Sequence, residues 1–158
     1  MEHSIKIGIS FGLTSGIITT LGLMVGLYTS TGSRLAVVGG ILVIAIADAL
    51  SDAFGVHVAE ESENVHTEKE IWAATISTFL CKFLVASTFV IPVLLFSLAV
   101  SVLVSIVWGV LLLSILSLYI GYEQENETWK IVLEHLTIAT VVLIITFYTG
   151  KGVEVLFG

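Results

Sequence analysis

The sequence predicts an all-α membrane protein built from five transmembrane helices. Hydrophobic residues make up 56% of its 158 residues, charged residues make up only 12%, and the mean hydropathy is +1.06. Soluble domains are about a quarter charged, so this chain is distinguished by its shortage of charge. Near-continuous apolar segments of about 18 residues or more recur along it, and each is long enough to cross a hydrocarbon core about 30 Å thick.

The five expected spans follow one another with short polar connections and form a single domain over residues 1–158. They are placed at about residues 7–28, 35–58, 71–95, 99–120 and 129–149. The first span lacks the basic stretch and the cleavage site of a signal peptide, so it is expected to be retained. Polar residues at 29–34, charged residues at 60–70 and acidic residues at 123–127 separate the other spans.

No charge separates the third span from the fourth. Only Pro92 and the serines Ser97 and Ser101 indicate a turn there. A single helix over residues 72–120 would be far longer than a bilayer is thick, because a helix rises about 1.5 Å per residue. A tight hairpin between these two spans is therefore required.

Five spans place the two termini on opposite sides of the membrane. Three basic residues fall on the N-terminal side and two on the other: Lys6, Lys69 and Lys130 against Arg34 and Lys151. This small excess favours a cytoplasmic N-terminus under the positive-inside rule. Almost all the glutamates also lie on the N-terminal side. Acidic residues contribute little to orientation, so this asymmetry indicates either a mouth that concentrates cations or a pair of solvated loops.

The sequence disfavours several classes of function. The net charge of −7 argues against a nucleic-acid partner. The single cysteine, Cys81, permits no intramolecular disulfide. There is no Walker-type phosphate loop and no Ser-His or Cys-His pair with supporting context. The chain is therefore expected to be neither an ATP-driven pump nor an enzyme, and no resident cofactor is expected.

Two aspartates interrupt the second span. Asp48 and Asp52 are one helical turn apart, so their carboxylates lie on one face of the helix. Acidic side chains at membrane depth are costly and are normally tolerated only where they face protein, water or an ion. The pair is therefore expected to bind a divalent cation, and two close carboxylates also suit exchange with protons. The structural alternative is a pair that is bonded to neighbouring hydroxyls or to Lys82.

Lys82 is the basic residue expected deepest in a span. It lies ten residues beyond Trp72, about 15 Å along the helix and so near mid-membrane. Its ammonium group would neutralise the aspartates when no cation is bound, so that cation entry becomes a competition with an internal amine. A salt bridge unrelated to any ion is the alternative.

The positions of several other polar residues on their helices indicate what roles they have. If the helix continues past Val58, Glu63 falls on roughly the same face as Asp52, with Glu60 somewhat further round, so both are expected to pass ions inward from the mouth. His57 projects from the opposite side and is expected to be an interfacial histidine rather than a ligand. Glu134 and His135, one turn into the fifth span, are either a second polar site or interface residues reached by water.

The first span combines small residues with hydroxyl groups. Gly8, Gly12 and Gly16 recur at four-residue spacing, which lets helices approach closely in a membrane. Ser15 and Thr19 are expected to add hydroxyl oxygens to the cation site, although such hydroxyls also bond to their own helix.

Four segments of the chain carry a family resemblance. Residues 12–27, GLTSGIITTLGLMVGL, resemble the first helix of vacuolar iron transporter-like proteins, and residues 47–63, ADALSDAFGVHVAEESE, resemble their second helix. Residues 89–95, FVIPVLL, are similar to the end of their third helix, and residues 146–152, TFYTGKG, to the end of their last. The resemblance implies a homodimer of five-helix subunits with the cation path between them. It also implies export of Fe²⁺ or Mn²⁺ from the cytosol, coupled to protons.

Departures from the family bear on which ion is carried. The family's first helix usually has aspartate where this chain has Ser15, and its second helix usually has methionine where this chain has Asp52. The family's large cytosolic metal-collecting domain is replaced here by residues 60–70. Carboxylate and hydroxyl oxygens suit harder ions such as Mn²⁺, Mg²⁺ or Ca²⁺ and are compatible with Fe²⁺.

The expected function is transport of a divalent metal ion, Fe²⁺ or Mn²⁺, out of the cytosol by proton exchange. The expected metal ligands are Asp48, Asp52, Ser15, Thr19, Glu60 and Glu63. The short connections between spans favour a prokaryotic cell membrane. The alternative is a non-transporting assembly or regulatory protein that keeps the transporter fold, and the missing first-helix aspartate and second-helix methionine favour it.

Overall fold

The chain is helical throughout the part that the structure describes. The computed structural model describes residues 1–123 and 127–158, and no strand occurs in these two ranges. The helices are α1 (Glu2–Thr31), α2 (Arg34–Val43), η1 (Ile44–Asp48), α3 (Ala49–Ser62), α4 (Glu68–Thr88), α5 (Val90–Leu95), α6 (Leu98–Glu123) and α7 (Thr128–Phe157). Within the expected acidic loop 123–127, residues 124–126 lie outside the described ranges.

Five helical segments are long and apolar enough to cross a membrane, as the sequence predicts. They comprise Glu2–Thr31, Arg34–Ser62, Glu68–Leu95, Leu98–Tyr122 and Thr128–Phe157. Most of these segments run several residues beyond the expected spans, because hydropathy registers only the apolar part of each helix. The prediction of an all-helical, multi-pass membrane protein is confirmed at this level.

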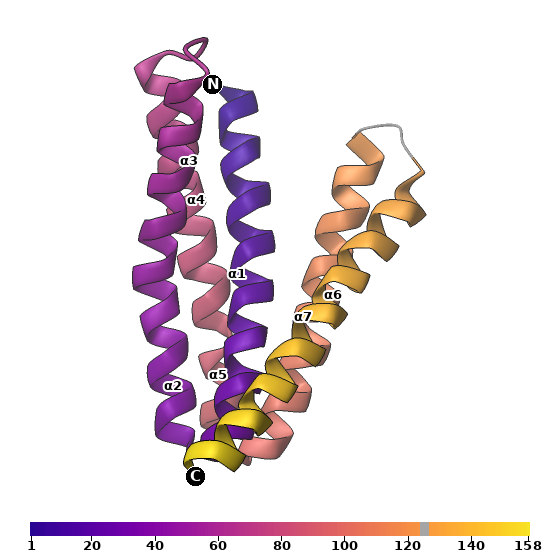
Figure 1. Cartoon of the computed structure of the whole chain (residues 1–158). Coiled ribbons are helices and arrows are strands. Elements are labelled where there is room, and N and C mark those ends of the chain that lie inside the picture. Colours follow the sequence, from indigo (N-terminus) through magenta and orange to yellow (C-terminus); the bar gives the residue numbers. More distant parts are fainter. Residues whose placement is uncertain (124–126) are drawn as a thin grey trace.

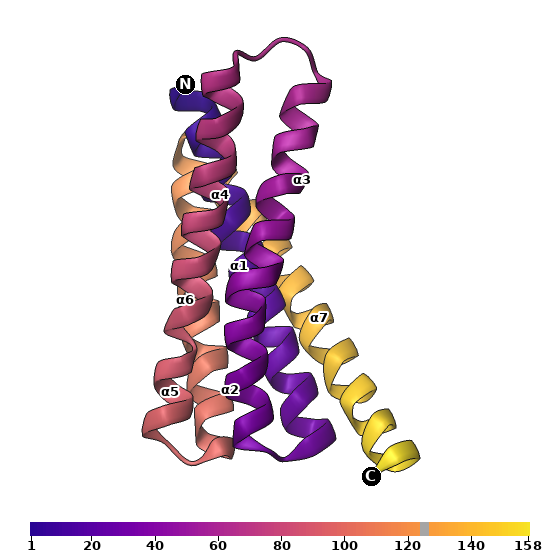
Figure 2. The same cartoon turned by 90° about the vertical axis from the view of Figure 1, so that its left-hand side faces the viewer.

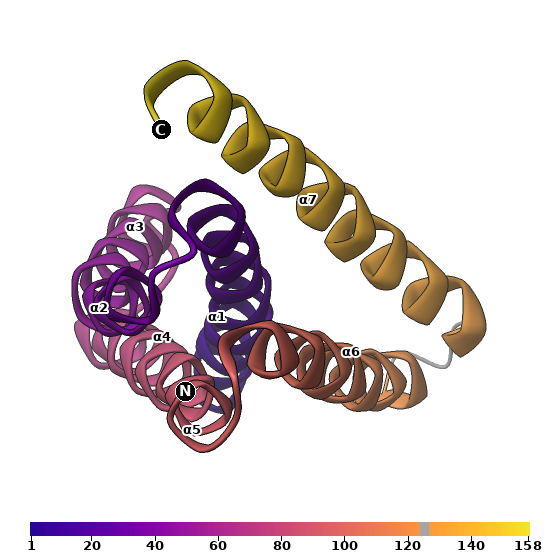
Figure 3. The ribbon, with the colours of Figure 1, turned by 90° about the horizontal axis from the view of Figure 1, so that it is seen from below.

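Helix α1 lies at the centre of the molecule (Figure 1). It packs against α4 and also against α6 and α7, while α2, η1 and α3 form one continuous rod that packs on α4. Seen from below, α1, α4 and this rod form a cluster, and α6 and α7 lie outside it (Figure 3). The two termini lie at opposite ends of the bundle, as five spans require (Figures 1 and 2).

Glycines allow α1 to approach α4 closely. A Cβ atom on Gly12 would lie 2.6 Å from the carbonyl oxygen of Thr78, and one on Gly16 would lie 2.5 Å from a methyl group of Val85. Both separations are too short for a real side chain without a shift of the helices. The close packing predicted from the four-residue spacing is therefore confirmed.

An arginine holds the hairpin between α5 and α6. The α5 helix ends at Leu95, and α6 begins at Leu98. Arg34, at the start of α2, donates from Nη1 to the carbonyl oxygen of Val93 (2.7 Å) and from Nη2 to that of Phe96 (2.8 Å). Carbonyl groups at a helix end have no partner further along the helix, so the guanidinium group satisfies them here. The tight turn expected between the third and fourth spans is present.

Candidate cation site

A single π-helical turn, η1, lies in the middle of the second span. It covers Ile44–Asp48 and separates α2 from α3. Turns of this type are rare in proteins, and those that do occur often lie at functional sites. The turn ends at Asp48, and Asp52 lies in the first turn of α3, so the irregularity lies directly beside both aspartates. The hydrophobic pattern of the sequence does not indicate it.

The two aspartates meet Lys82 of α4. The lysine is fully buried, and its Nζ atom lies 2.5 Å from Oδ2 of Asp48 and 2.5 Å from Oδ2 of Asp52. The ammonium group donates a hydrogen bond to Asp52, whereas its contact with Asp48 is an ion pair without hydrogen-bond geometry. Both carboxylates therefore point to one side of the rod, and the lysine is their shared counterion.

Ser15 of α1 completes this group. Its hydroxyl donates to Oδ2 of Asp52 at 2.6 Å and accepts from Nζ of Lys82 at 3.0 Å. We call the four side chains, Ser15, Asp48, Asp52 and Lys82, the Lys82 cluster. Three different spans supply them. Charges at this depth persist because they are paired, and Asp52 and Lys82 are also hydrogen-bonded to each other and to Ser15.

The Lys82 cluster contains more negative than positive charge. One ammonium group faces two carboxylates, so one negative charge is left uncompensated when all three groups are ionised. The side chains of Asp48 and Asp52 are 35% and 21% exposed, whereas that of Lys82 is 1% exposed. The amine thus reaches the carboxylates from inside the bundle, and part of each carboxylate side chain is left exposed.

Thr19, the second hydroxyl expected in the site, is bonded elsewhere. Its Oγ1 atom donates to the carbonyl oxygen of Ser15 at 2.8 Å, within its own helix. Thr19 also lines an apolar cavity of about 570 Å³ between α1 and α7, together with Gly22, Thr146 and Gly150. Its role as a metal ligand stays a prediction, whereas Ser15 lies against Asp52 and Lys82.

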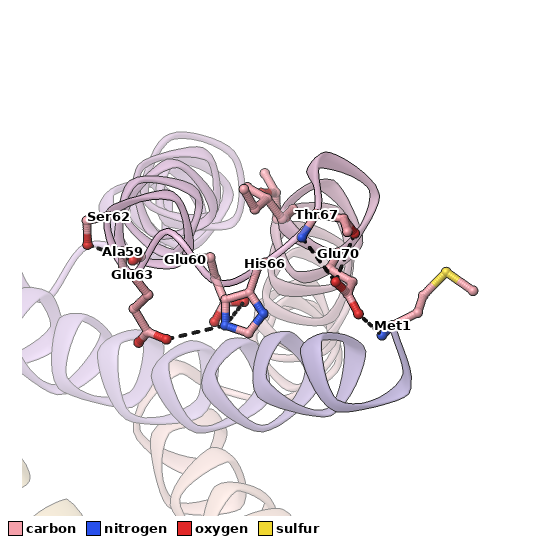
Figure 4. Close-up of polar contacts among 10 residues, drawn as sticks. Met1, Ala59, Glu60, Ser62, Glu63, His66, Thr67 and Glu70 are labelled. Carbon is pink, nitrogen blue, oxygen red and sulfur yellow. Dashed lines mark hydrogen bonds and ion pairs between the residues drawn. The ribbon is translucent and has the colours of Figure 1, made fainter.

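Glu60 and Glu63 lie at the N-terminal end of the bundle, where α3 ends. They share a neighbour that is not among the predicted ligands, His66 in the loop between α3 and α4. Nε2 of His66 lies 3.6 Å from Oε2 of Glu60 and 3.3 Å from Oε2 of Glu63 (Figure 4). We call these three residues the mouth cluster. Their regular three-residue spacing at a helix end is the one signal of it in the sequence.

Two further histidines form polar contacts between helices. Nδ1 of His57 lies 3.0 Å from the hydroxyl of Thr75, and its ring meets Trp72 edge-on. Nδ1 of His135 lies 2.8 Å from the hydroxyl of Ser117, which links α7 to α6. His57 is thus engaged with α4 rather than with the aspartates.

The Lys82 cluster places carboxylate and hydroxyl oxygens around a position that a cation already occupies. Such a set can exchange one cation for another, or for a proton. In residues 1–123 and 127–158, no three histidine, cysteine, aspartate or glutamate side chains form a ready-made metal-binding group. No protein-family model, no curated protein and no solved structure matches the chain.

Proposed function

We propose that the chain transports a divalent metal ion, Fe²⁺ or Mn²⁺, across the membrane and that the Lys82 cluster binds it. The observation that carries this proposal is the position of the Lys82 ammonium group, which Asp48 and Asp52 share at 2.5 Å. Two carboxylates converge in the middle of a span on a point where positive charge is stabilised. Oxygen ligands of this kind suit Mn²⁺ and are compatible with Fe²⁺.

The ammonium group of Lys82 can couple metal transport to the movement of protons. A divalent ion and the ammonium group cannot occupy the same point, so ion binding requires that the amine withdraw or lose its proton. A proton released on binding and regained when the ion leaves amounts to antiport. In the ion-free state the lysine offsets one of the two negative charges, so the aspartates are not left at membrane depth without a counterion.

The exposed side of the carboxylates favours a homodimer with the ion path between the subunits. Carboxylate atoms that face lipid are costly, so the open side of Asp48 and Asp52 has to be covered by protein, water or an ion. A second copy on this face would bring four carboxylates to one path. A dimer of this kind is the arrangement that the family resemblance implies. Together with the four family-like segments, the exposed carboxylates therefore support membership of the vacuolar iron transporter-like family.

The N-terminal end of the bundle would be the entrance. Its acidic residues raise the local concentration of cations, and Glu60 and Glu63 lie where entry ligands are expected. With the N-terminus cytoplasmic, transport through this entrance exports the ion from the cytosol. The natural setting of such a compact exporter is a prokaryotic cell membrane.

A second candidate function is supported by the same cluster. The Lys82 ammonium already pairs with both carboxylates, and Ser15 closes the hydrogen-bond ring. An ion pair at this depth can fix how helices assemble without binding any further ion. The chain would then be a non-transporting assembly or regulatory protein with the fold of a transporter.

Metal flux in proteoliposomes separates the two candidates. Vesicles loaded with a Mn²⁺-sensitive or a pH-sensitive dye report metal and proton movement for the purified chain. The wild-type chain and the control Lys151→Met, which removes a half-exposed lysine of α7, should move Mn²⁺ and protons in opposite directions. Asp48→Asn combined with Asp52→Asn should abolish both fluxes. Unchanged flux in the double variant would refute the site, and a wild-type chain that moves neither Mn²⁺ nor Fe²⁺ would favour the structural role.

A further inference from the structure

The mouth cluster contains a carboxylate oxygen that is buried without a hydrogen bond. Glu60 is only 6% exposed, and its Oε2 atom is buried and accepts no hydrogen bond from any residue that the structure describes. Its ion-pair partner, Nε2 of His66, lies 3.6 Å away, beyond hydrogen-bonding distance. Burial of a carboxylate without a bonded partner is costly, so this oxygen needs a positive charge beside it.

His66 lies near both carboxylates of the mouth cluster, hydrogen-bonded to Glu63 and ion-paired with Glu60 (Figure 4). Its Nε2 atom is 3.3 Å from Oε2 of Glu63 and 3.6 Å from Oε2 of Glu60. Ligands bonded to one ion at about 2.1 Å, with angles of roughly 90–110°, lie about 3.0–3.4 Å from each other. The separation between His66 and Glu63 falls within this range, and the one between His66 and Glu60 lies just beyond it, so a small movement would let these side chains share one ion.

The local fold brings the three side chains together. Glu60 and Glu63 lie one turn apart at the end of α3, and Asn64 follows with a positive φ of 53°, which reverses the chain. His66 comes just before Thr67, whose side chain caps α4. The side chain of Glu63 is 62% exposed, so its carboxylate is free to rotate onto an ion held by the other two residues.

We propose that Glu60, Glu63 and His66 bind a divalent transition-metal ion at the N-terminal end of the bundle, separately from the Lys82 cluster. One imidazole with two carboxylates suits Mn²⁺, Fe²⁺ or Zn²⁺, whereas Ca²⁺ and Mg²⁺ prefer oxygen ligands alone. The described side chains form no finished three-ligand group, and rotation of Glu63 is the movement that completes one. Asp52 lies about 12 Å further along the helix, too far to share the ion. A chain that transported nothing would still bind metal here.

Mn²⁺ alone is the probe, because electron paramagnetic resonance reports both its binding and the type of its ligands. The full chain, free of any histidine tag, is titrated in detergent, and bound Mn²⁺ is counted from the loss of the free-ion signal. Nitrogen modulation in the pulsed spectrum identifies an imidazole ligand. We expect one Mn²⁺ per chain with this modulation. The Asp52→Asn chain should retain it, which separates this ion from one bound at the Lys82 cluster.

Matched variants assign the modulation to its residue. His66→Gln should remove it, and Glu63→Gln should weaken Mn²⁺ binding at least about tenfold. Glu63 is largely exposed, so its replacement leaves the fold intact. The control His57→Gln, at a histidine paired with Thr75, should change neither property.

Two results would overturn the mouth site. One is nitrogen modulation that survives in His66→Gln, and the other is a wild-type chain that binds no Mn²⁺ at millimolar concentration. Absence of Mn²⁺ flux with the modulation intact would instead count against transport and leave the mouth site standing. The two proposals can therefore fail independently.

Discussion

Lys82 is buried in an apolar interior with its ammonium group against two carboxylates. Lys82→Met keeps the length of the side chain but leaves Asp48 and Asp52 without their counterion. Removing one partner of a buried pair costs about 3–5 kcal/mol, so we expect a much lower unfolding temperature in detergent. Mn²⁺ should stabilise Lys82→Met more than the wild-type chain, because the ion takes the place of the ammonium group. Equal unfolding temperatures for Lys82→Met and the control Lys151→Met would contradict this role.

Ser15 and Thr19 form a matched pair of hydroxyl residues on α1. Ser15 bonds to the carboxylate of Asp52, whereas Thr19 bonds to a carbonyl oxygen of its own helix. Ser15→Ala leaves a partly buried charge short of a hydrogen bond and should cost about 1–3 kcal/mol of unfolding free energy. Thr19→Ala should stay within about 0.5 kcal/mol of the wild-type chain. Thermal unfolding in one detergent compares them, and equal losses would show that Thr19 also supports the site.

At the residue scale, the sequence indicated most of the Lys82 cluster. The four-residue spacing placed Asp48 and Asp52 on one face, and the rise of the helix placed Lys82 at their depth. Which α1 hydroxyl reaches them depends on how α1 is rotated about its axis, and packing against α4 sets that rotation. His66 was not predictable, because its position follows from the positive φ of Asn64 in a short loop.

At the scale of the helices, the close approach of α1 to α4 sets the geometry of the Lys82 cluster, since Ser15 and Lys82 come from these two helices. Gly12→Ala would place a Cβ atom 2.6 Å from the carbonyl oxygen of Thr78 and must push the helices apart. We expect a lower unfolding temperature and reduced Mn²⁺ flux. Gly39→Ala in α2 is the control, because its Cβ would meet nothing within 4 Å. It should be neutral or stabilise the chain by up to about 1 kcal/mol. If Gly12→Ala and Gly39→Ala have the same unfolding temperature and Mn²⁺ flux, the contact between α1 and α4 at Gly12 does not constrain the Lys82 cluster.

The helices themselves were largely predictable, because hydropathy reports the length of chain that a bilayer can cover. The hairpin after α5 was also predictable, since one helix in its place would be too long. The π-helical turn at Ile44–Asp48 was not. A π-helical turn holds one more residue than an α-helical turn, which changes neither the number of apolar residues in the span nor their spacing in the sequence. Its position is instead set by the tertiary packing around Lys82.

At the scale of the whole molecule, the face of η1 and α3 that carries Asp48 and Asp52 is where a second copy is expected, because both carboxylates are partly exposed there. Gly55 and Ala59 of α3 are exposed, and each follows one of the two aspartates by seven residues, which places them on the same face of the helix. Tyr122 at the end of α6 is 84% exposed. A residue near a two-fold axis lies opposite its own copy, and a disulfide forms when the two Cα atoms come within about 7 Å. In a Cys81→Ser chain, Gly55→Cys or Ala59→Cys should therefore give covalent dimers on mild oxidation in membranes.

Tyr122→Cys is the matched control for this test, because Tyr122 is strongly exposed but belongs to a different helix, α6. It should stay monomeric under the same oxidation, and the crosslinked α3 variants should keep Mn²⁺ flux. Equal crosslinking at Tyr122 would show that the α3 dimers form by random collision and not at a specific interface. If the α3 variants do not crosslink, the open side of Asp48 and Asp52 must be covered by something other than a second copy. Coverage by a different protein would fit the assembly or regulatory role, since unprotected carboxylates are not stable against lipid.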